Sequence, residues 1–219
     1  MLAPLDDKAL ARPDHLVLFA PMIGITSTAR FAGIFGWPAL VPAFDKAAWL
    51  GIVPEFNPFK FNSFPVNGAR QSSLVARRLQ AQIDRHARED NLKGLAPVLT
   101  FQSVVDFTVS TRAIVAALYA KLPANGSELV LFDLNRNAKI GPMLRRSTDT
   151  VLERLLPEAP RNFRSTIITN ADRGTANVVA RTTEAGASAE QVTDVGLAFP
   201  PGVFSLSHLA IPFPLSDPL

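Results

Sequence analysis

The chain has 219 residues, of which 47% are hydrophobic and 19% charged, which is typical of one globular domain and excludes a disordered chain. No apolar run reaches about 18 residues, and the net charge of +3 is spread along the chain, so neither a membrane-spanning helix nor a nucleic-acid partner is expected. The absence of cysteine excludes disulfides, thiolate catalysis and cysteine-ligated zinc, and it leaves the cellular compartment open.

The first predicted strand is the apolar run Leu16–Ala20, which Pro21 ends. A short apolar run of this kind is typical of a strand buried on both faces of a mostly parallel sheet. Residues 9–13 predict the tail of a helix before that strand. Residues 1–8 lack the basic start and long apolar stretch of a secretory signal, so the chain shows no export signal of its own.

Residues 26–67 carry seven of the 15 phenylalanines and both tryptophans, broken by five prolines. We interpret this segment as a small cap inserted between core elements, because long proline-broken connections are usually functional. An aromatic lining favours an apolar ligand, although the rings could equally form a small separate core. The candidate substrate-binding residues are Phe31, Phe35, Trp37, Trp49, Phe56 and Phe59.

Residues 66–88 alternate apolar and basic side chains at helical spacing. This pattern predicts an amphipathic helix whose basic face is solvated, with His86 on the polar face. A contact with phosphate or a lipid headgroup is the alternative. The basic residues concerned are Arg70, Arg77, Arg78, Arg85 and Arg88.

The next elements predict a strand, helix and strand unit of a parallel sheet. The apolar run 97–105 predicts the first strand, and Ser110 followed by Thr111 predicts the start of a helix that reaches Leu122. An Asn-Gly turn then leads to the strand Glu128–Asp133.

Further along the chain we predict a helix over 140–156 and a strand over Arg164–Thr169, with a weaker strand over Asn177–Thr182. Residues 184–202 are small, polar and rich in glycine and proline, which favours a surface loop. A last short strand over 203–206 precedes His208.

Asp106 and His208 each follow a predicted strand, and the carboxyl ends of strands are where open α/β sheets place their active groups. A carboxylate that orients a histidine is half of the Ser-His-Asp machinery of acyl transfer. The alternatives are a capping or loop aspartate and a histidine of purely structural role. Asp133, also at a strand end, is the second candidate carboxylate.

Four segments resemble serine α/β-hydrolases of the group that holds monoacylglycerol lipases, lysophospholipases and serine aminopeptidases. Residues 103–109, Ser-Val-Val-Asp-Phe-Thr-Val, resemble the acid loop of that group. Residues 16–21 resemble the strand that follows the nucleophile helix. Residues 54–65 and 205–214 are similar to segments of bacterial lysophospholipase-like members.

The resemblance implies an α/β-hydrolase-type mostly parallel sheet flanked by helices, with only the later strands present and a cap over residues 26–67. It implies the acid at Asp106 and the base at His208. The Gly-x-Ser-x-Gly turn that carries the nucleophile is absent. Ser188 comes nearest, but it lacks the second glycine and follows the acid. The chain also departs from the group because no histidine directly follows the strand Glu128–Asp133.

The sequence therefore predicts part of a serine hydrolase of acyl esters, such as a lysophospholipid or a monoacylglycerol, that needs no cofactor or metal. Without a nucleophile, this chain alone should show no substantial esterase activity. The alternative is a non-catalytic remnant of a lipase-like hydrolase that binds a lipid or another partner. A sheet represented only by its later strands should also expose an apolar edge, through which the chain could self-associate.

Overall fold

The computed structural model describes residues 1–24, 42–52, 63–104, 106, 109–134, 155–172 and 175–199. Most of the helix predicted over 140–156 and the strand predicted over 203–206 lie outside these residues. The helices are α1 (Ala3–Asp6), α3 (Val66–Arg88) and α4 (Thr111–Ala117), with 3-10 turns η3 (Pro42–Ala48), η4 (Asn91–Gly94) and η5 (Tyr119–Lys121). The strands are β1 (Leu16–Phe19), β2 (Trp49–Gly51), β3 (Phe64–Pro65), β4 (Val98–Ser103), β5 (Glu128–Asp133), β6 (Arg164–Asn170), β7 (Asn177–Thr183) and β8 (Glu190–Ala198).

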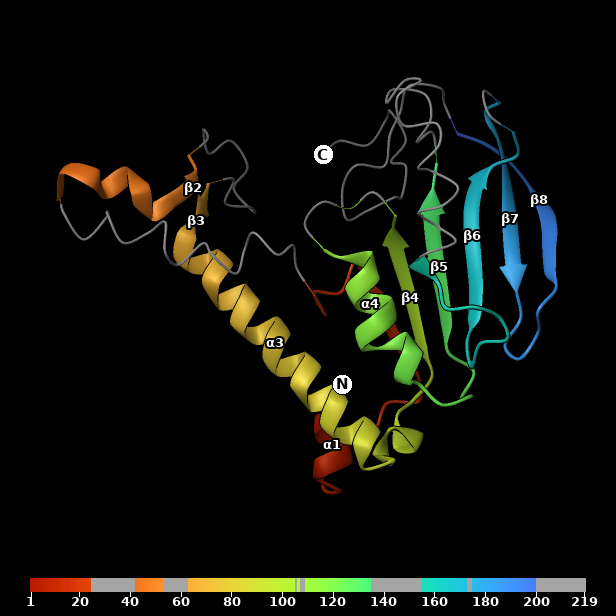
Figure 1. Ribbon diagram of the computed structural model, residues 1–219, viewed down its shortest axis with the longest axis horizontal. Helices are drawn as coiled ribbons and strands as arrows, with labels where there is room; N and C mark the ends of the chain where they lie inside the picture. The colour runs from red at the N-terminus through yellow and green to blue at the C-terminus, as the bar shows by residue number, and fades with distance from the viewer. Residues whose placement is uncertain are drawn as a thin grey trace.

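Six of these strands form one mixed sheet in the order β1-β4-β5-β6-β7-β8 (Figure 1). The pairs from β1 to β6 are parallel, and β7 and β8 join antiparallel. The predicted α/β class with a mostly parallel sheet is confirmed. The unit of β4, α4 and β5 is also confirmed, and β5 has the predicted bounds.

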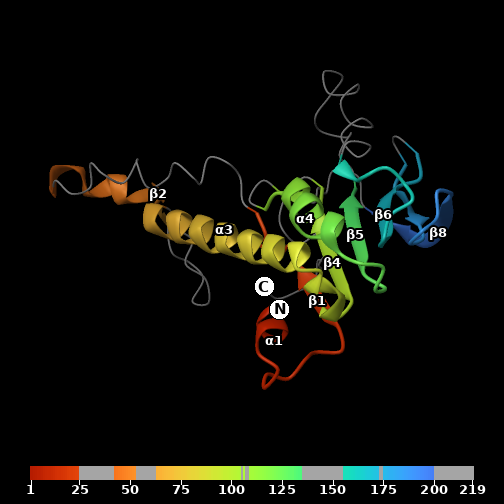
Figure 2. The same ribbon diagram turned by 60° about the horizontal axis from the view of Figure 1, so that its bottom comes forward.

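The two longer helices, α3 and α4, lie side by side on one side of the sheet (Figures 1 and 2). Right-handed crossovers explain this arrangement, because the chain moves from β1 to β4 to β5 in one direction across the sheet. The main core lies between these helices and the sheet. It contains Ile83 of α3, Ile114 and Leu118 of α4, and Leu129 and Leu131 of β5.

Helix α3 spans the predicted residues, and its apolar face enters the core. His86 differs from the prediction, because its side chain is buried and not on a solvated face. The Asn91 side chain lies 3.2 Å from the His86 Nδ1 atom, and an Asp6 oxygen lies 3.5 Å from its Nε2 atom. The turn η4 and the helix α1 fold back over the end of α3, which the helical pattern of residues 66–88 alone could not reveal.

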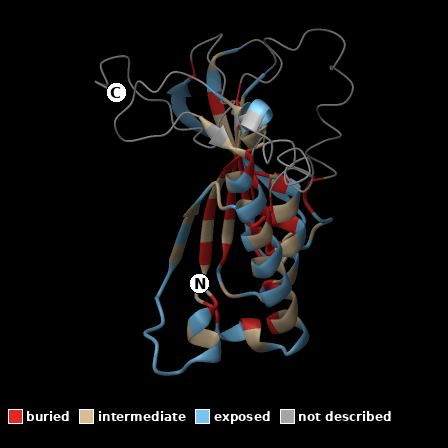
Figure 3. Ribbon diagram, turned by 90° about the vertical axis from the view of Figure 1, so that its left-hand side faces the viewer, coloured by how far each residue is buried: buried red, intermediate tan, exposed pale blue. Residues whose placement is uncertain are grey.

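Strand β1 forms where predicted, but it is not buried on both faces. It is the outermost strand, and the side chains of Val17 and Phe19 are 54% and 53% exposed. Figure 3 shows the difference, because β1 has no buried residue while β4 and β5 carry several. The reason is that nothing in the described chain pairs with the free edge of β1 or covers these two side chains.

Two other predictions of local structure are wrong. Residues 9–13 are not helical, and the one helix before β1 is α1. Within the predicted loop 184–202, residues 190–198 form β8, whose nine residues are all exposed. β8 pairs only with β7 and covers no core, so it needs no apolar face. Its polar composition therefore gave no signal for a strand.

The described part of the predicted cap contains η3 and a small hairpin of β2 and β3. Both lie at the amino-terminal end of α3 and away from the six-stranded sheet in two views (Figures 1 and 2). Residues 25–41 and 53–62 of the cap lie outside the described residues. Within the described chain, no helix combines the length and apolar character that a membrane crossing needs.

Candidate active site at the carboxyl end of β4

Asp106 lies three residues beyond β4, at the carboxyl end of this parallel strand, which lies between β1 and β5. Its backbone N–H donates to the Ser103 carbonyl over 3.4 Å, which turns the chain away from the sheet. The predicted position of Asp106 after a strand is confirmed. Parallel neighbours end at the same edge of a sheet, so this edge is where a catalytic group could meet residues from β5 and β6.

Two donors orient the Asp106 carboxylate. The backbone N–H of Val109 donates to Oδ1 over 2.9 Å, and the Gln102 side-chain amide donates to Oδ2 over 3.3 Å. Gln102 is only 1% exposed, and its amide also donates to the Ser103 carbonyl over 3.1 Å. The Val109 N–H and the Gln102 amide therefore help to fix the direction in which the Asp106 carboxylate points.

The loop that carries Asp106 is tied to the helix behind it. Ser110 is the N-cap of α4, as predicted, and its side chain accepts from the Ala113 N–H over 3.2 Å. The Thr111 hydroxyl donates to the Ser103 carbonyl over 3.0 Å. Hydrogen bonds to the Ser103 carbonyl therefore connect the end of β4 with the loop and with the start of α4, and they fix the position of the Asp106 backbone.

Asp133, the second candidate carboxylate, is the last residue of β5 and is buried. It is aligned with Thr169 of β6, whose hydroxyl donates to the Asp133 carbonyl over 3.0 Å. Asp106 and Asp133 thus follow neighbouring parallel strands at the same edge of the sheet. Sequence reasoning missed Gln102, although a polar amide within an apolar strand was a signal available for it.

Of the other predicted site residues, the structure describes only Trp49, which does not lie at this edge. Trp49 lies in β2, and its side chain is exposed at the far end of α3. Ser188 lies in the exposed connection between antiparallel β7 and β8, so it is not in a turn from strand to helix. Outside the described residues lie His208, Phe31, Phe35, Trp37, Phe56 and Phe59.

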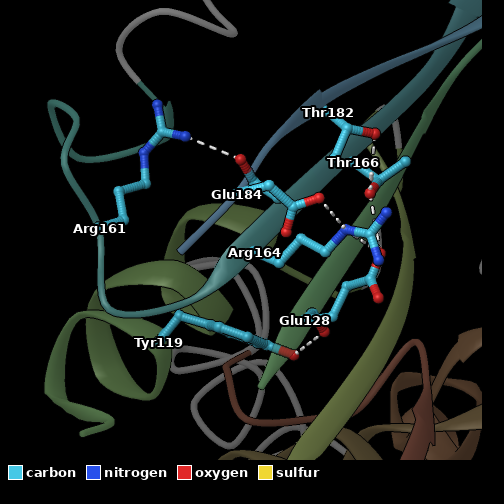
Figure 4. A network of polar contacts seen from close by, with 8 residues as sticks. Tyr119, Glu128, Arg161, Arg164, Thr166, Thr182 and Glu184 are labelled. Carbon is cyan, nitrogen blue, oxygen red and sulfur yellow. Dashed lines mark hydrogen bonds and ion pairs between the residues drawn. The ribbon is translucent and has the colours of Figure 1, made fainter. Parts of the chain in front are cut away.

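A second polar cluster lies at the other end of the strands, where β5 and β6 begin (Figure 4). Arg164 lies between Glu128 and Glu184, at 3.7 Å and 3.3 Å. Thr166 donates to Glu128 over 2.8 Å. The Tyr119 hydroxyl donates to the Glu128 carbonyl over 2.6 Å, and burial raises the pKa of this tyrosine above its ordinary value.

The charged groups of this cluster are paired with one another. They lie at the amino ends of the strands, whereas Asp106 lies at the carboxyl end of β4. Burial also lowers the pKa of the neighbouring Arg161, whose side chain donates to the Ser165 hydroxyl over 2.7 Å. We therefore regard the cluster as structural. Within the described chain no group of His, Asp and Glu side chains is arranged to hold a metal ion.

Comparisons with protein-family models, with curated proteins and with solved structures found no match. The fold and the site define the chain as an α/β protein with a mixed, mostly parallel six-stranded sheet and a carboxylate at the carboxyl end of an internal parallel strand. Any function beyond this class must be argued from the residues of the chain itself.

Proposed function

We propose that this chain is part of a serine hydrolase of acyl esters, in which Asp106 orients the ring of His208 and His208 acts as the base. The observation that carries the proposal is the Asp106 carboxylate, held by the Val109 N–H and the Gln102 amide at the end of β4. An oriented carboxylate fixes the tautomer of the catalytic imidazole and stabilises the cation that forms in acyl transfer.

The chain order of the strands supports the hydrolase-type fold to which the residues point. β1, β4 and β5 are successive parallel strands, and Asp106 follows the middle one. In the hydrolase group the histidine follows the strand next after the acid, whereas here the three strands β6, β7 and β8 come between β5 and His208. They lengthen the chain between the acid and His208 and explain why no histidine directly follows β5.

The substrate in this proposal is an ester of a fatty acyl group, such as a lysophospholipid or a monoacylglycerol. The aromatic composition of residues 26–67 supports an apolar substrate. The nucleophilic serine and the donors that stabilise the oxyanion would come from polypeptide that the present sequence does not contain.

A second candidate function is a non-catalytic remnant that binds a lipid or another apolar partner. The exposed side chains of Val17 and Phe19 on β1 favour it, because large apolar groups at a sheet edge mark interaction surfaces. The two functions differ in whether Asp106 and His208 form a pair.

We expect His208 to carry its proton on Nδ1 at alkaline pH, because a carboxylate acceptor selects the tautomer that donates to it. The Asp106→Asn substitution should shift His208 toward the Nε2–H tautomer, since an amide can donate to Nδ1. Long-range ¹⁵N–¹H correlation spectra distinguish the two tautomers. The chain has only three histidines, so a His208→Gln variant assigns the signal.

His86 is the internal control in the same spectra, because it lies at the other end of the sheet and contacts Asn91 and Asp6. Its signals should be the same in the Asp106→Asn variant. If the His208 signals are also unchanged by this substitution, the acid and base assignment is wrong and the binding-remnant proposal gains support.

The isolated chain should hydrolyse a short-chain nitrophenyl ester no faster than buffer does. The reason is that the groups that form the acyl intermediate and stabilise its charge are absent, and each is worth several kcal/mol of barrier, roughly 10²–10³-fold for a single oxyanion donor. Release of nitrophenol measures the rate. Turnover that disappears in both Asp106→Asn and His208→Ala would show that the chain is active alone.

A further inference from the structure

The face of the sheet opposite α3 and α4 carries a row of aromatic side chains. The rings of Phe19 and Phe101 stack with centroids 5.0 Å apart, and those of Phe101 and Phe132 with centroids 6.4 Å apart. The strand registers place Val17 and Leu99 beside this row. Across β1, β4 and β5 the described residues therefore form an apolar surface, which we call the aromatic face.

Among the described residues, the charged side chains on this face lie at the amino ends of β5 and β6 and are paired there. Glu128 and Arg164 are aligned across β5 and β6, and Arg164 also contacts Glu184 (Figure 4). The carboxyl half of the face is apolar by comparison, with Phe132 and Ile168 partly buried. A segment that crosses from the amino end of β7 to Val17 on β1 would bury this apolar surface without separating the pair of Glu128 and Arg164.

The described chain ends at this same face. Phe199 is buried in a small cluster with Leu134 and Val178, and Phe132 and Ile168 pack against that cluster. The Phe199 backbone N–H donates to the Ala176 carbonyl over 2.8 Å, which fixes where the chain leaves β8. Residues 200–219 therefore start at one end of the aromatic face.

We propose that the aromatic face is the docking surface for the carboxyl-terminal segment of this chain, residues 200–219. The occupant is suited to the surface by composition, because Asp217 is its only ionised side chain and large apolar residues recur from Val203 to Phe213. An extended chain would place Phe204, Leu206 and His208 on one side. Apolar contact with the face would then also direct the His208 ring.

The length of the segment suffices to cross the sheet. Four strand spacings separate β7 from β1, or about 19 Å at about 4.8 Å each. Phe199 lies near the level of Ala171 on β6, whereas Val17 is in register with Arg164, about seven residues or roughly 23 Å further along the strands. The diagonal path is therefore about 30 Å, and eleven residues beyond Phe199 span up to about 36 Å when extended, which brings residue 210 within reach of Val17. Covalent linkage also gives the segment a high effective concentration at the face, which a second copy of the chain lacks.

The chain contains no cysteine, so Val17→Cys provides a single thiol at the edge of the aromatic face. We expect this thiol in the full chain to react with a maleimide dye several-fold more slowly than Val192→Cys on exposed β8, each rate being divided by its value in urea. Adding Phe204→Ser and Leu206→Ser should raise the Val17→Cys rate to that of Val192→Cys, which itself stays constant.

Equal rates in the presence and absence of the two serine substitutions would overturn the proposal. Protection that grows with protein concentration, together with a doubled mass in light scattering, would assign the face to a second copy instead. A direct measurement avoids the serine variants: Val17→Cys with Ala210→Cys should form an intramolecular disulfide on mild oxidation, and Val192→Cys with Ala210→Cys should not. None of these readouts depends on whether Asp106 and His208 form a catalytic pair.

Discussion

Replacing Ile83 by alanine lowers the free energy of unfolding by about 2–5 kcal/mol, the range for a buried isoleucine whose removal leaves a cavity. The Ile83 side chain is fully buried on the inner face of α3, in the cluster that contains Ile114 and Leu129. The loss of stability has two parts. The variant buries less apolar surface on folding, and the neighbouring side chains fill only part of the cavity that remains. Urea unfolding followed by circular dichroism measures it.

Val75→Ala on the same helix is the matched control, because the Val75 side chain is 65% exposed. A substitution of this kind changes stability by no more than about 0.5 kcal/mol. Equal effects of the two substitutions would mean that α3 does not pack on the sheet in solution, and the one-sided core would then be wrong.

Tyr119 is the sole tyrosine of the chain, and in the folded protein it should stay protonated at the pH where free tyrosine ionises. Burial raises its pKa above the ordinary value of about 10, and the nearby Glu128 charge adds to the effect. The tyrosinate absorbance should therefore rise well above pH 10 and coincide with loss of the far-ultraviolet circular dichroism signal of the fold.

The direction of the stability change follows from the raised pKa. Below about pH 10 the hydroxyl is protonated in both the folded and the unfolded chain, so its full contribution to stability is present. Above that pH the unfolded chain loses the proton while the folded chain keeps it, and stability falls with each further increase in pH until the folded pKa is reached.

Tyr119→Phe tests this assignment. At neutral pH it removes the donor to the Glu128 carbonyl and should cost about 1–3 kcal/mol, because a buried acceptor loses its partner. It should also make the unfolding free energy less steep between pH 10 and the alkaline transition. Normal titration of Tyr119 near pH 10 with the fold intact would contradict the buried position of the hydroxyl.

The parts of the fold that could be predicted are those where local pattern and tertiary packing agree. Helix α3 has a strong apolar and basic alternation, and β5 is an apolar run after an Asn-Gly turn. β8 could not be predicted, because its pairing with β7 is made by backbone groups whatever its side chains are. Nor did residues 66–88 reveal the burial of His86, which depends on α1 and η4, two elements outside that segment.

For the candidate site, the position of Asp106 at a strand end could be predicted from the break after an apolar run. The geometry of its carboxylate could not, because it depends on Gln102, four residues earlier on the same strand, and on the turn to Val109. The partnership of Asp106 with His208 stays a prediction, since about a hundred residues separate them along the chain, including the four described strands β5 to β8.

The two margins of the sheet differ, and this difference limits how copies of the chain could join. β1 ends the parallel side with a backbone edge that no described strand pairs with, whereas β8 has a shifted register against β7 and a glycine, Gly196, with φ of 70°. Irregularities of this kind discourage further strands from adding. Two molecules could pair through their β1 strands about a twofold axis. Only the irregular β8 edges would then remain at the two outer ends of the joined sheet, so edge pairing would give a closed dimer and not a growing fibre.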